Sequence, residues 1–419
     1  MDLIPRTEYM EQLTLFQDKD LIKVITGVRR CGKTTLMMLF KEALRRSGVA
    51  DQAIVSVNFE DFDAQELTDP KALHDYLKSR LIPGKTVYFF LDEIQHVRDF
   101  PRFLDSLYIR DGVDLYVTGS NANLLSSEIA TLISGRYVEI KMLPLSFREF
   151  VGAQAEEKSL AENYRLYLEQ SAFPYALALE SPTAVRTYLD GIYSTILVKD
   201  VMQRRRIADS GLLESATRFL FDSIGSLVST KKIADTLTSR GRKVDAKTVE
   251  KYVSALTESF VLYKARRYDI QGKEQLARLE KYYLVDLGLR RVVLGNRAMD
   301  VGHVLENVVY LELVRRGFEV YVGKADDTEV DFVAKNEDGL QYLQVASTVR
   351  DSAVLKRELR SLQKIQDSYP KLLLTLDEDP EADFDGIRRV NVLRWLIGET
   401  GRKGYESTDS SSGSIRFAR

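Results

Sequence analysis

The sequence predicts an α/β fold that begins with a parallel β-sheet, and two observations point to it. Residues 21–26 form a short, mostly apolar run rich in β-branched side chains, and residues 35–44 follow with helical spacing and good helix formers. Apolar runs at 87–91 and 114–119 repeat the strand pattern. Because such runs are typical of strands covered on both faces, we expect them to lie in one parallel sheet between helices.

The bulk composition limits the class of protein. A chain of 419 residues is too long for one ordinary core, so we expect two or three domains. Hydrophobic residues make up 44% and charged residues 29%, as in soluble globular proteins. The 60 basic and 62 acidic side chains nearly balance, so the overall charge argues neither for nor against nucleic acid.

The cysteine content and the length of the apolar runs indicate the cellular compartment of the protein. The single cysteine, Cys31, excludes an internal disulfide and a cysteine-based zinc site. No apolar h-region follows a basic start, and no apolar run reaches the roughly 18 residues that a membrane span needs. We therefore expect a cytoplasmic protein that has no membrane partner.

A glycine-rich loop separates the first predicted strand from its helix. Residues 27–34 read G-V-R-R-C-G-K-T, which fits the pattern G-x-x-x-x-G-K-[ST] in the strand, loop and helix context that this pattern requires. Glycines let backbone N–H groups turn toward phosphates, and the helix N-terminus adds a positive dipole. The alternative is a chance match in a glycine turn. We predict a P-loop that binds ATP, formed by Gly27, Val28, Arg29, Arg30, Cys31, Gly32, Lys33, Thr34 and Thr35.

Four residues, two in this loop and two at the end of a later predicted strand, predict metal-assisted hydrolysis. Lys33 can reach the β- and γ-phosphates, and the Thr34 hydroxyl can bind Mg²⁺. The strand at 87–91 ends in Asp92, which would hold Mg²⁺ through water, and in Glu93, which would be the general base for the attacking water. Two acids alone could also be an acidic strand end at the sheet surface. Together with the upstream loop they predict an ATPase that uses ATP and Mg²⁺.

Several segments together resemble one prokaryotic AAA family. They are residues 23–34, the L-D-E-I-Q block at 91–95, the T-G-S turn at 118–120 and P-L-S-F-R-E-F at 144–150. Members of that family pair an AAA+ ATPase module with a C-terminal domain of unknown function that resembles a nuclease fold. The resemblance covers nearly the whole chain and implies an AAA+ core at 1–150 and a helical lid at 151–206. One departure is the S-A-F-P string at 171–174, where members often carry Gly-Gly before Phe-Pro.

The resemblance also implies roles for five polar residues. Ser120 and Asn121 match the sensor-1 position, beside the γ-phosphate, if the strand at 114–119 lies between the strands that carry the two motifs. Arg136 precedes a predicted strand at 137–140, where AAA+ rings place the arginine finger that reaches a neighbouring subunit's ATP. It could instead be a solvated arginine that caps a helix C-terminus. Phosphate chemistry does not demand Arg29 and Arg30, which the resemblance explains as contacts to a neighbouring subunit or the lid.

The middle of the chain predicts helices and then a winged-helix-like domain. Helical spacing covers 160–179, interrupted by Pro174, and 183–206, which form the expected lid. Within 207–295, Ser229 and Asp245 are candidate caps of two helices, and runs at 260–265 and 281–285 are candidate wing strands. Residues 230–270 carry ten basic and five acidic side chains, a modest footprint for phosphates. DNA contact and a packing or oligomer module both remain open.

The last domain, at 296–400, has the order of a PD-(D/E)xK nuclease without its full set of residues. Glu306 on a predicted helix and Asp331 on a predicted strand match the metal-binding acids. Gln344 and Ala346 replace the expected Glu and Lys, and a neutral amide is a weaker Mg²⁺ ligand than a carboxylate. We therefore expect a small α/β, nuclease-like fold with a degenerate site at Glu306, Asp331 and Gln344. A serine-rich, disordered tail is expected at 401–419.

Three functions remain open after these assignments. The first is an oligomeric AAA+ ATPase, with a hexamer favoured, whose hydrolysis moves the C-terminal domains against a DNA or protein client. The second is a nucleotide-gated switch in which slow hydrolysis only resets a conformation. The third and weakest is an ATP-dependent DNA nuclease. No residue pattern names a substrate or a pathway.

Overall fold

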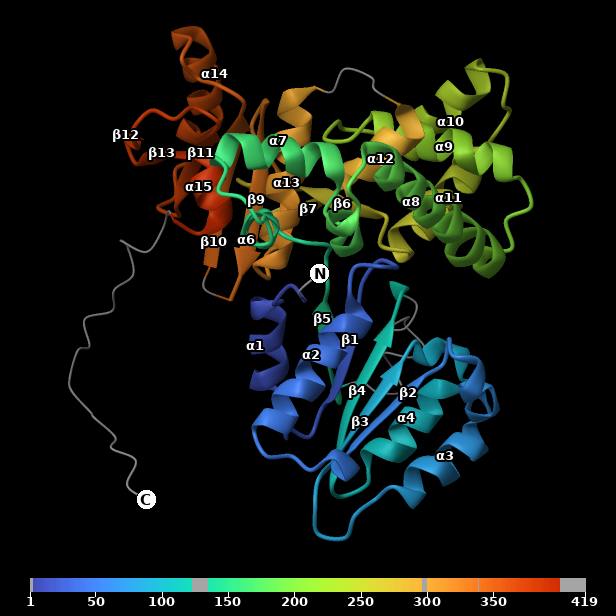
Figure 1. Cartoon of the computed structure of the whole chain (residues 1–419). Coiled ribbons are helices and arrows are strands. Elements are labelled where there is room, and N and C mark those ends of the chain that lie inside the picture. Colours follow the sequence, from blue (N-terminus) through green and yellow to red (C-terminus); the bar gives the residue numbers. More distant parts are fainter. Residues whose placement is uncertain (1–2, 123–134, 296–299, 338, 400–419) are drawn as a thin grey trace, which may run out of the picture.

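The computed structural model describes residues 3–122, 135–295, 300–337 and 339–399. The chain forms two lobes: the elements up to β5 surround one sheet, and the elements from α6 onward form a second lobe above it (Figure 1). The expected tail at 401–419 lies outside the described residues, as do residues 123–133 of the amphipathic helix expected at 122–133.

The first lobe is built on a five-stranded sheet in the order β2-β3-β4-β1-β5, and every neighbouring pair is parallel. This order confirms the predicted parallel sheet, and it places β4 between the strands that precede the two motifs. Every residue of β1 and β3 is buried, as their apolar runs predict. The strands are β1 (Ile22–Thr26), β2 (Ile54–Asn58), β3 (Val87–Asp92), β4 (Val113–Gly119) and β5 (Tyr137–Lys141).

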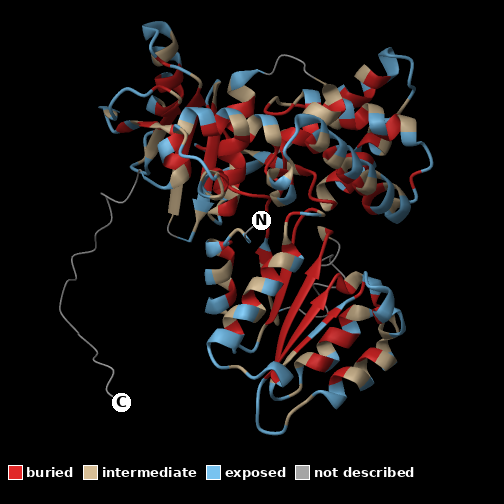
Figure 2. Cartoon of the chain, in the orientation of Figure 1, coloured by how far each residue is buried: buried red, intermediate tan, exposed pale blue. Residues whose placement is uncertain are grey.

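Helices cover both faces of this sheet because alternate strand residues point to opposite sides (Figure 2). Phe90 and Tyr116 belong to one apolar core with α1 and α2, whereas Phe89 and Leu115 belong to a second core with α3 and α4. These elements are α1 (Thr7–Leu15), α2 (Lys33–Arg46), α3 (Pro70–Ser79) and α4 (Phe100–Tyr108), with 3₁₀ turns η1 (Asp51–Ala53), η2 (Phe62–Thr68) and η3 (Ile94–His96).

The second lobe starts with the helices predicted for the lid. The structure confirms helical segments over the ranges 160–179 and 183–206, and the second continues from α8 directly into a π-helix, η6. The elements are α6 (Phe147–Gly152), α7 (Leu160–Gln170), η5 (Pro174–Ala178), α8 (Pro182–Thr195) and η6 (Ile196–Gln203).

Three further helices pack beside them and confirm the two predicted caps. The Ser229 hydroxyl accepts the Lys232 N–H at 3.2 Å, and the Asp245 carboxylate accepts the Thr248 N–H at 2.7 Å. These bonds satisfy N–H groups that a helix start leaves without an intrahelical partner. The helices are α9 (Ser210–Asp222), α10 (Thr230–Ser239) and α11 (Ala246–Glu258), and α12 (Leu287–Leu294) follows later in the chain.

An eight-stranded mixed sheet forms the rest of the second lobe, in the order β12-β13-β11-β10-β9-β8-β6-β7. The helices α13 (Val301–Arg315), α14 (Ser352–Gln363) and α15 (Val392–Ile397) pack against it. Its strands are β6 (Leu262–Asp269), β7 (Glu274–Leu284), β8 (Glu319–Ala325), β9 (Thr328–Asn336), β10 (Gly339–Ala346), β11 (Lys371–Thr375), β12 (Ala382–Phe384) and β13 (Ile387–Asn391).

The hairpin that was expected to be a wing is part of this large sheet. β6 and β7 pair antiparallel over residues 262–284, and β6 also pairs parallel with β8 through Arg267, Tyr268 and Asp269. A wing would project freely from its helices, whereas β6 has a neighbouring strand on each side. The sheet therefore runs across the boundary that we expected at residue 295.

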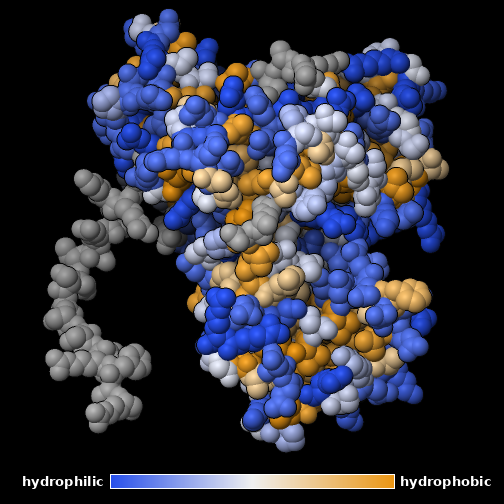
Figure 3. All heavy atoms as spheres, viewed as in Figure 1, coloured by the Kyte–Doolittle hydropathy of each residue, from blue (hydrophilic) through white to orange (hydrophobic). Residues whose placement is uncertain are grey.

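The two lobes contact each other through α1. Tyr9 is buried, and its hydroxyl accepts the N–H of Leu143 and the Nη1 of Arg315, each at 3.0 Å. The apolar core under α1 and α2 continues into the second lobe. Hydrophilic residues cover much of the viewed face, with apolar side chains in scattered patches between them (Figure 3). Among the described residues, no helix is both long enough and apolar enough to span a membrane.

Candidate functional site

The glycine-rich loop lies between the end of β1 and the start of α2, as the motif predicts. Gly27 has φ 155°, and a Cβ there would lie 2.2 Å from the carbonyl oxygen of Met142. Gly32 has φ 107° and directly precedes Lys33, the first residue of α2. Only glycine fits these two positions without strain, so the loop can follow a path that leaves room for a ligand above the helix N-terminus.

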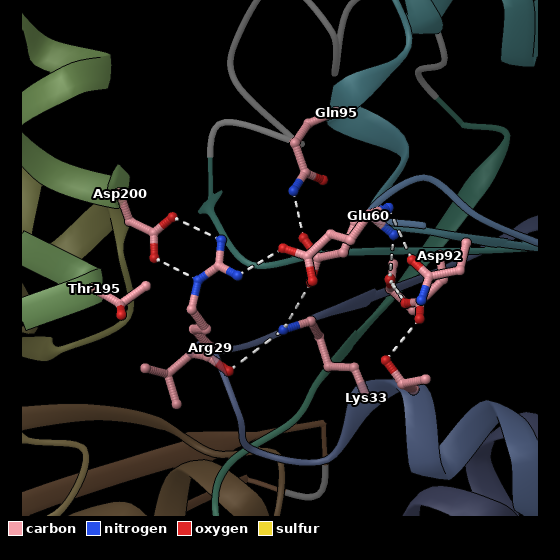
Figure 4. A network of polar contacts seen from close by, with 12 residues as sticks. Arg29, Lys33, Glu60, Asp92, Gln95, Thr195 and Asp200 are labelled. Atoms are coloured by element: carbon pink, nitrogen blue, oxygen red, sulfur yellow. Dashed lines mark hydrogen bonds and ion pairs between the residues drawn. The ribbon is translucent and has the colours of Figure 1, made fainter. Parts of the chain in front are cut away.

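Lys33 is buried below this loop and points toward the end of β3 (Figure 4). Its Nζ donates to the carbonyl oxygens of Gly27 at 3.1 Å and Val28 at 3.3 Å. The same atom lies 3.6 Å from Oε1 of Glu93. The loop lysine and the predicted general base therefore face each other across one small site.

Thr34 and Asp92, the two predicted Mg²⁺ ligands, are in direct contact. Thr34 Oγ1 donates to Asp92 Oδ2 at 2.6 Å, and the Thr118 hydroxyl donates to the other carboxylate oxygen. Burial raises the pKa of Asp92 above its usual range, and the two hydroxyls oppose that rise. The pair presents oxygen atoms from α2 and β3 at one point, which suits a hard divalent cation.

Glu93 has an unusual backbone conformation that aims its carboxylate into the site. Its φ is 57°, in the left-handed region, and its N–H donates to Thr118 Oγ1 at 2.9 Å. Burial alone would raise the pKa of Glu93, but the charge of Lys33 and the hydrogen bond from Gln95 lower it below its usual range. Glu93 is thus an ionised carboxylate, as a general base must be.

Ser120 and Asn121 follow β4 and are both buried. Ser120 helps to lower the pKa of Glu93, but within the described residues its buried hydroxyl has no hydrogen-bond partner. The structure thus brings together the polar residues predicted from three strand ends, at 26–34, 92–93 and 120–121.

Arg29 connects the loop to the second lobe. Its guanidinium donates to Asp200 at 3.2 Å and 3.4 Å and to Glu60 at 2.7 Å (Figure 4). Asp200 is buried within the π-helix η6. Arg29 therefore contacts the helical segment of its own chain that was expected to belong to the lid, one of the two partners expected for it. Arg30, with φ 69°, is exposed.

Arg6 is a supporting residue that sequence reasoning missed. It is buried, and it donates to the carbonyl oxygens of Cys31 at 3.0 Å and Leu143 at 2.7 Å and to the Glu149 carboxylate at 2.8 Å. These bonds hold the back of the loop against the segment after β5. A lone arginine before α1 belongs to no local pattern, so no signal near it in the sequence pointed to this role.

Arg136 lies away from this site. In the parallel pairing of β1 with β5, Ile22 is opposite Tyr137 and Thr26 is opposite Lys141. Arg136 precedes β5, so it lies at the edge of the sheet opposite to the glycine loop. Its guanidinium forms an ion pair with Asp105 and lies over the ring of Tyr108, 5.5 Å from the centroid.

The three residues of the degenerate nuclease-like site also come together. Glu306 on α13, Asp331 on β9 and Gln344 on β10 line one pocket of about 490 Å³ in the second lobe. Gln344 Nε2 donates to Glu358 at 2.9 Å, and its Oε1 accepts the Asp331 N–H at 3.3 Å. The amide is thus engaged in hydrogen bonds that join two strands and a helix.

The pocket contains a lysine that sequence reasoning missed. Lys281 Nζ lies 2.8 Å from Glu306, 2.7 Å from Glu329 and 3.9 Å from Asp331. Lys281 comes from β7, more than one element before the predicted motif. Its ammonium occupies the space between carboxylates where a cation would lie. Among the described residues, no group of three or more acids, histidines or cysteines is arranged to hold a metal ion.

The parallel sheet, the glycine loop and the acids at the end of β3 define a P-loop protein of the AAA class. A family model described as an AAA domain matches residues 19–151, and a model of a domain of unknown function matches residues 161–300. An uncharacterized protein of Haemophilus influenzae is 39% identical over 399 residues, which span 94% of this chain and 99% of that relative. The chain belongs to the same family as that protein.

More distant proteins are similar along much of the chain. An uncharacterized protein of Methanocaldococcus jannaschii is 27% identical over 361 residues, covering 82% of this chain and 78% of its own. Among solved structures, a Walker-type ATPase of Pyrococcus abyssi aligns with a TM-score of 0.49 and 14% identity, over 70% of this chain and 96% of that chain.

Proposed function

We propose that this protein binds ATP with Mg²⁺, hydrolyses it, and passes the nucleotide state to its second lobe. The observation that supports this proposal most is the convergence of Lys33, Thr34, Asp92 and Glu93 at the carboxyl edge of one parallel sheet. Ligands of open α/β sheets bind at this edge.

The residues present fit the magnesium nucleotide. No side chain caps the N-terminus of α2 in the described chain, and its first turn holds no acid, so the helix start suits a phosphate. Thr34 and Asp92 would hold Mg²⁺, which takes few protein ligands and completes its shell with water and phosphate oxygens. When bound, Mg²⁺ would supply charge neutralisation on the phosphates.

In the proposed reaction, Lys33 and Glu93 exchange the contacts that they make in this structure for new ones. On binding, Lys33 exchanges the carbonyl oxygens of Gly27 and Val28 for β- and γ-phosphate oxygens. Glu93, freed from the lysine, accepts a proton from the water that attacks the γ-phosphate. Gln95 holds Glu93 in position, and the proposed role of Ser120 and Asn121, which are buried after β4, is to contact the γ-phosphate.

Arg29 is the proposed connection between hydrolysis and movement. It lies in the loop, and its partner Asp200 belongs to η6 at the end of the lid helices. A change in the loop on loss of the γ-phosphate can therefore reach the second lobe through this charged contact, in addition to the bonds of Arg6 to Cys31 and Glu149. We propose that this contact moves the second lobe against a DNA or protein client.

Arg136 is the proposed arginine finger of a homo-oligomer, with a hexamer favoured. Its place at the sheet edge opposite to its own loop separates it from its own nucleotide, which supports a neighbour's site as the proposed target. In that role it would exchange Asp105 for phosphate oxygens of the neighbouring subunit.

The test of hydrolysis is Glu93→Gln. The amide keeps the shape of the site but cannot accept the proton, so we expect the turnover rate to fall by about 10²–10⁴-fold with ATP affinity retained. A fluorescent ATP analogue measures binding and released phosphate measures turnover. Glu66→Gln on η2, at an exposed position outside the site, is the matched control. Full turnover in Glu93→Gln would exclude Glu93 as the base.

A further inference from the structure

A group of exposed cations lies on two consecutive helices of the second lobe and on the turn that joins them. Residues 229–254 contain seven basic and three acidic side chains, a net charge of +4 in a chain whose total is −2. All seven are exposed, and we call them the basic helical face: Lys231, Lys232, Arg240, Arg242, Lys243, Lys247 and Lys251.

The fold places these cations outward because the helices bury their other sides. In α10, Ile233, Ala234 and Leu237 are buried, and in α11 the buried residues include Val249 and Leu256. Within the described residues, no ion pair joins any member of the basic helical face to an acid. The nearby Glu258 is already paired with Arg205, and Asp245 is engaged as the cap of α11.

Three of the cations lie where a helix by itself disfavours them. Lys231 and Lys232 are in the first turn of α10, and Lys247 is in the first turn of α11. A helix N-terminus carries partial positive charge, so cations there are destabilising and anions are stabilising. Neither first turn contains an acid. At α11 the Asp245 cap already supplies a negative charge, so a bound anion would offset this repulsion at the start of α10.

A shallow hollow beside α10 is lined by side chains of the kinds that bind phosphate oxygens. Its volume is about 440 Å³, and besides the acid Asp235 it is lined by two lysines and three hydroxyls: Lys231, Lys232, Ser229, Thr236 and Ser239. Lysine ammonium groups, short hydroxyl side chains and helix N-termini are the usual donors to nucleic-acid backbone phosphates.

We propose that the basic helical face binds duplex DNA, with α11 in the major groove and the start of α10 on the backbone. An α-helix fits that groove, and the exposed side chains of α11 are Lys247, Lys251, the short Ser254 and one acid, Glu250. Because β6 and β7 belong to the large sheet, no free wing adds to the contact, and phosphate contacts dominate the binding. This inference extends the proposed function by naming its client, but it concerns a surface that can be tested without hydrolysis.

The experiment measures binding of a short fluorescein-labelled DNA duplex to the full chain by anisotropy, from about 50 to 200 mM salt. For Lys247→Ala/Lys251→Ala and for Lys231→Ala/Lys232→Ala we expect Kd to rise roughly tenfold at low salt. The slope of log K against log salt should fall by about two in each variant, because each lysine that is removed neutralised one phosphate. Lys71→Ala/Lys78→Ala on α3, also two exposed lysines, is the matched control.

Two results would overturn the proposal. One is equal affinity of the helical-face variants and the α3 control, with all proteins folded by circular dichroism. The other is displacement of the duplex by poly-glutamate at equal charge concentration, which would make the face a site for an acidic protein. Glu93→Gln separates this from the ATPase proposal: it should bind duplex normally, and the helical-face variants should hydrolyse ATP normally without DNA.

Discussion

Ser171 has a backbone conformation that side chains rarely adopt. Its φ is 114° and its ψ is 151°, in a region that is almost restricted to glycine. Asp286, buried under it, accepts hydrogen bonds from the Ser171 hydroxyl at 3.1 Å and from the Ala172 N–H at 2.7 Å. The hydroxyl also accepts the Phe173 N–H at 3.1 Å. Hydrogen bonds thus maintain a strained residue directly after α7.

Two substitutions at Ser171 separate the strain from the hydrogen bonds. Both Ser171→Gly and Ser171→Ala lose the hydroxyl, but only glycine relieves the backbone strain. We expect Ser171→Gly to be more stable than Ser171→Ala by about 1–3 kcal/mol. Urea unfolding of the two variants side by side measures the difference. Equal stabilities would show that the conformation carries no strain.

Among single residues, the sequence could predict those whose function depends on a short motif in one stretch of the chain. Lys33, Thr34, Asp92 and Glu93 lie in short motifs with fixed spacing, and the structure brings them together. Arg6, which contacts the loop from before the first strand, lies outside any motif because its partners come from distant segments. Only the folded chain defines such contacts.

The contact between Arg29 and η6 shows how a single charged side chain can connect two elements. Asp200 is nearly fully buried, with its side chain 2% exposed, whereas the other partner of Arg29, Glu60, is 43% exposed. A buried carboxylate without a counter-charge is costly, and an exposed one is well solvated. The stabilising part of this contact should therefore be the bond to the π-helix.

Arg29→Met should lower the free energy of unfolding by about 3–5 kcal/mol, because it leaves Asp200 buried with only Arg204, 3.9 Å away, as a counter-charge. Glu60→Gln removes the exposed partner and should cost less than about 1 kcal/mol. Chemical denaturation of both variants tests this contrast. Similar losses would mean that the lid contact is not the stabilising one.

The carboxylate pocket of the second lobe gives a prediction that depends on pH. Burial and the charge of Glu306 raise the pKa of Asp331 well above its usual range, and Lys281 opposes that rise. Burial alone would lower the pKa of Lys281, but Glu306, Asp331 and Glu329 raise it. When the pKa of a lysine is raised in the folded state, the lysine contributes its full stabilisation of the fold at every pH below its unfolded-state pKa of about 10.4. The contribution of the Lys281 charge itself is therefore constant from pH 5 to 8.

Lys281→Met should be destabilising, and more so at pH 8 than at pH 5. Without the ammonium the pKa of Asp331 rises further above its unfolded-state value, so a penalty develops as the pH increases above that unfolded-state value. We expect a loss of about 3–5 kcal/mol at pH 8 and a smaller loss at pH 5, measured by urea unfolding.

The matched control for the pocket is Lys264→Met on β6. Its partner Glu280 is 3.2 Å away and both side chains are partly exposed, so the loss should be under about 1 kcal/mol and the same at both pH values. A pH-independent loss in Lys281→Met would contradict the counter-charge role.

Elements with local signals were predicted, and those whose pairing is non-local were not. Ser229 and Asp245 identified two helix starts because a cap acts within its own turn. The hairpin at 262–284 was expected to be a wing, since its pattern is that of any hairpin. Its neighbour β8 lies far along the chain, and Lys281 reaches Glu306 only because that sheet forms.

For the whole molecule, the open question is whether copies of the chain complete each other's sites. Arg136 is 42% exposed on the side chain, paired with Asp105 and remote from its own loop. If it acts on a neighbour, removing it should affect catalysis but not the binding of ATP.

Arg136→Ala should lower turnover by about 10³–10⁵-fold and leave ATP affinity unchanged. Arg102→Ala on α4, which breaks another surface ion pair at 3.7 Å, should have no effect. Mass in solution of Glu93→Gln with an ATP analogue then shows whether a ring forms. A monomer, together with normal turnover in Arg136→Ala, would favour the nucleotide-gated switch over the ring.

The parallel pairing of β6 with β8 sets the order in which the chain can fold during synthesis. All five strands of the first sheet lie before residue 142, so that lobe can complete its strand pairing early on the ribosome. β6 gains its second neighbour only after residues 319–325 have emerged. Until then the new hairpin exposes an unpaired strand edge, the feature through which nascent chains aggregate. We therefore expect chains that stall between these strands to be the ones that chaperones must hold.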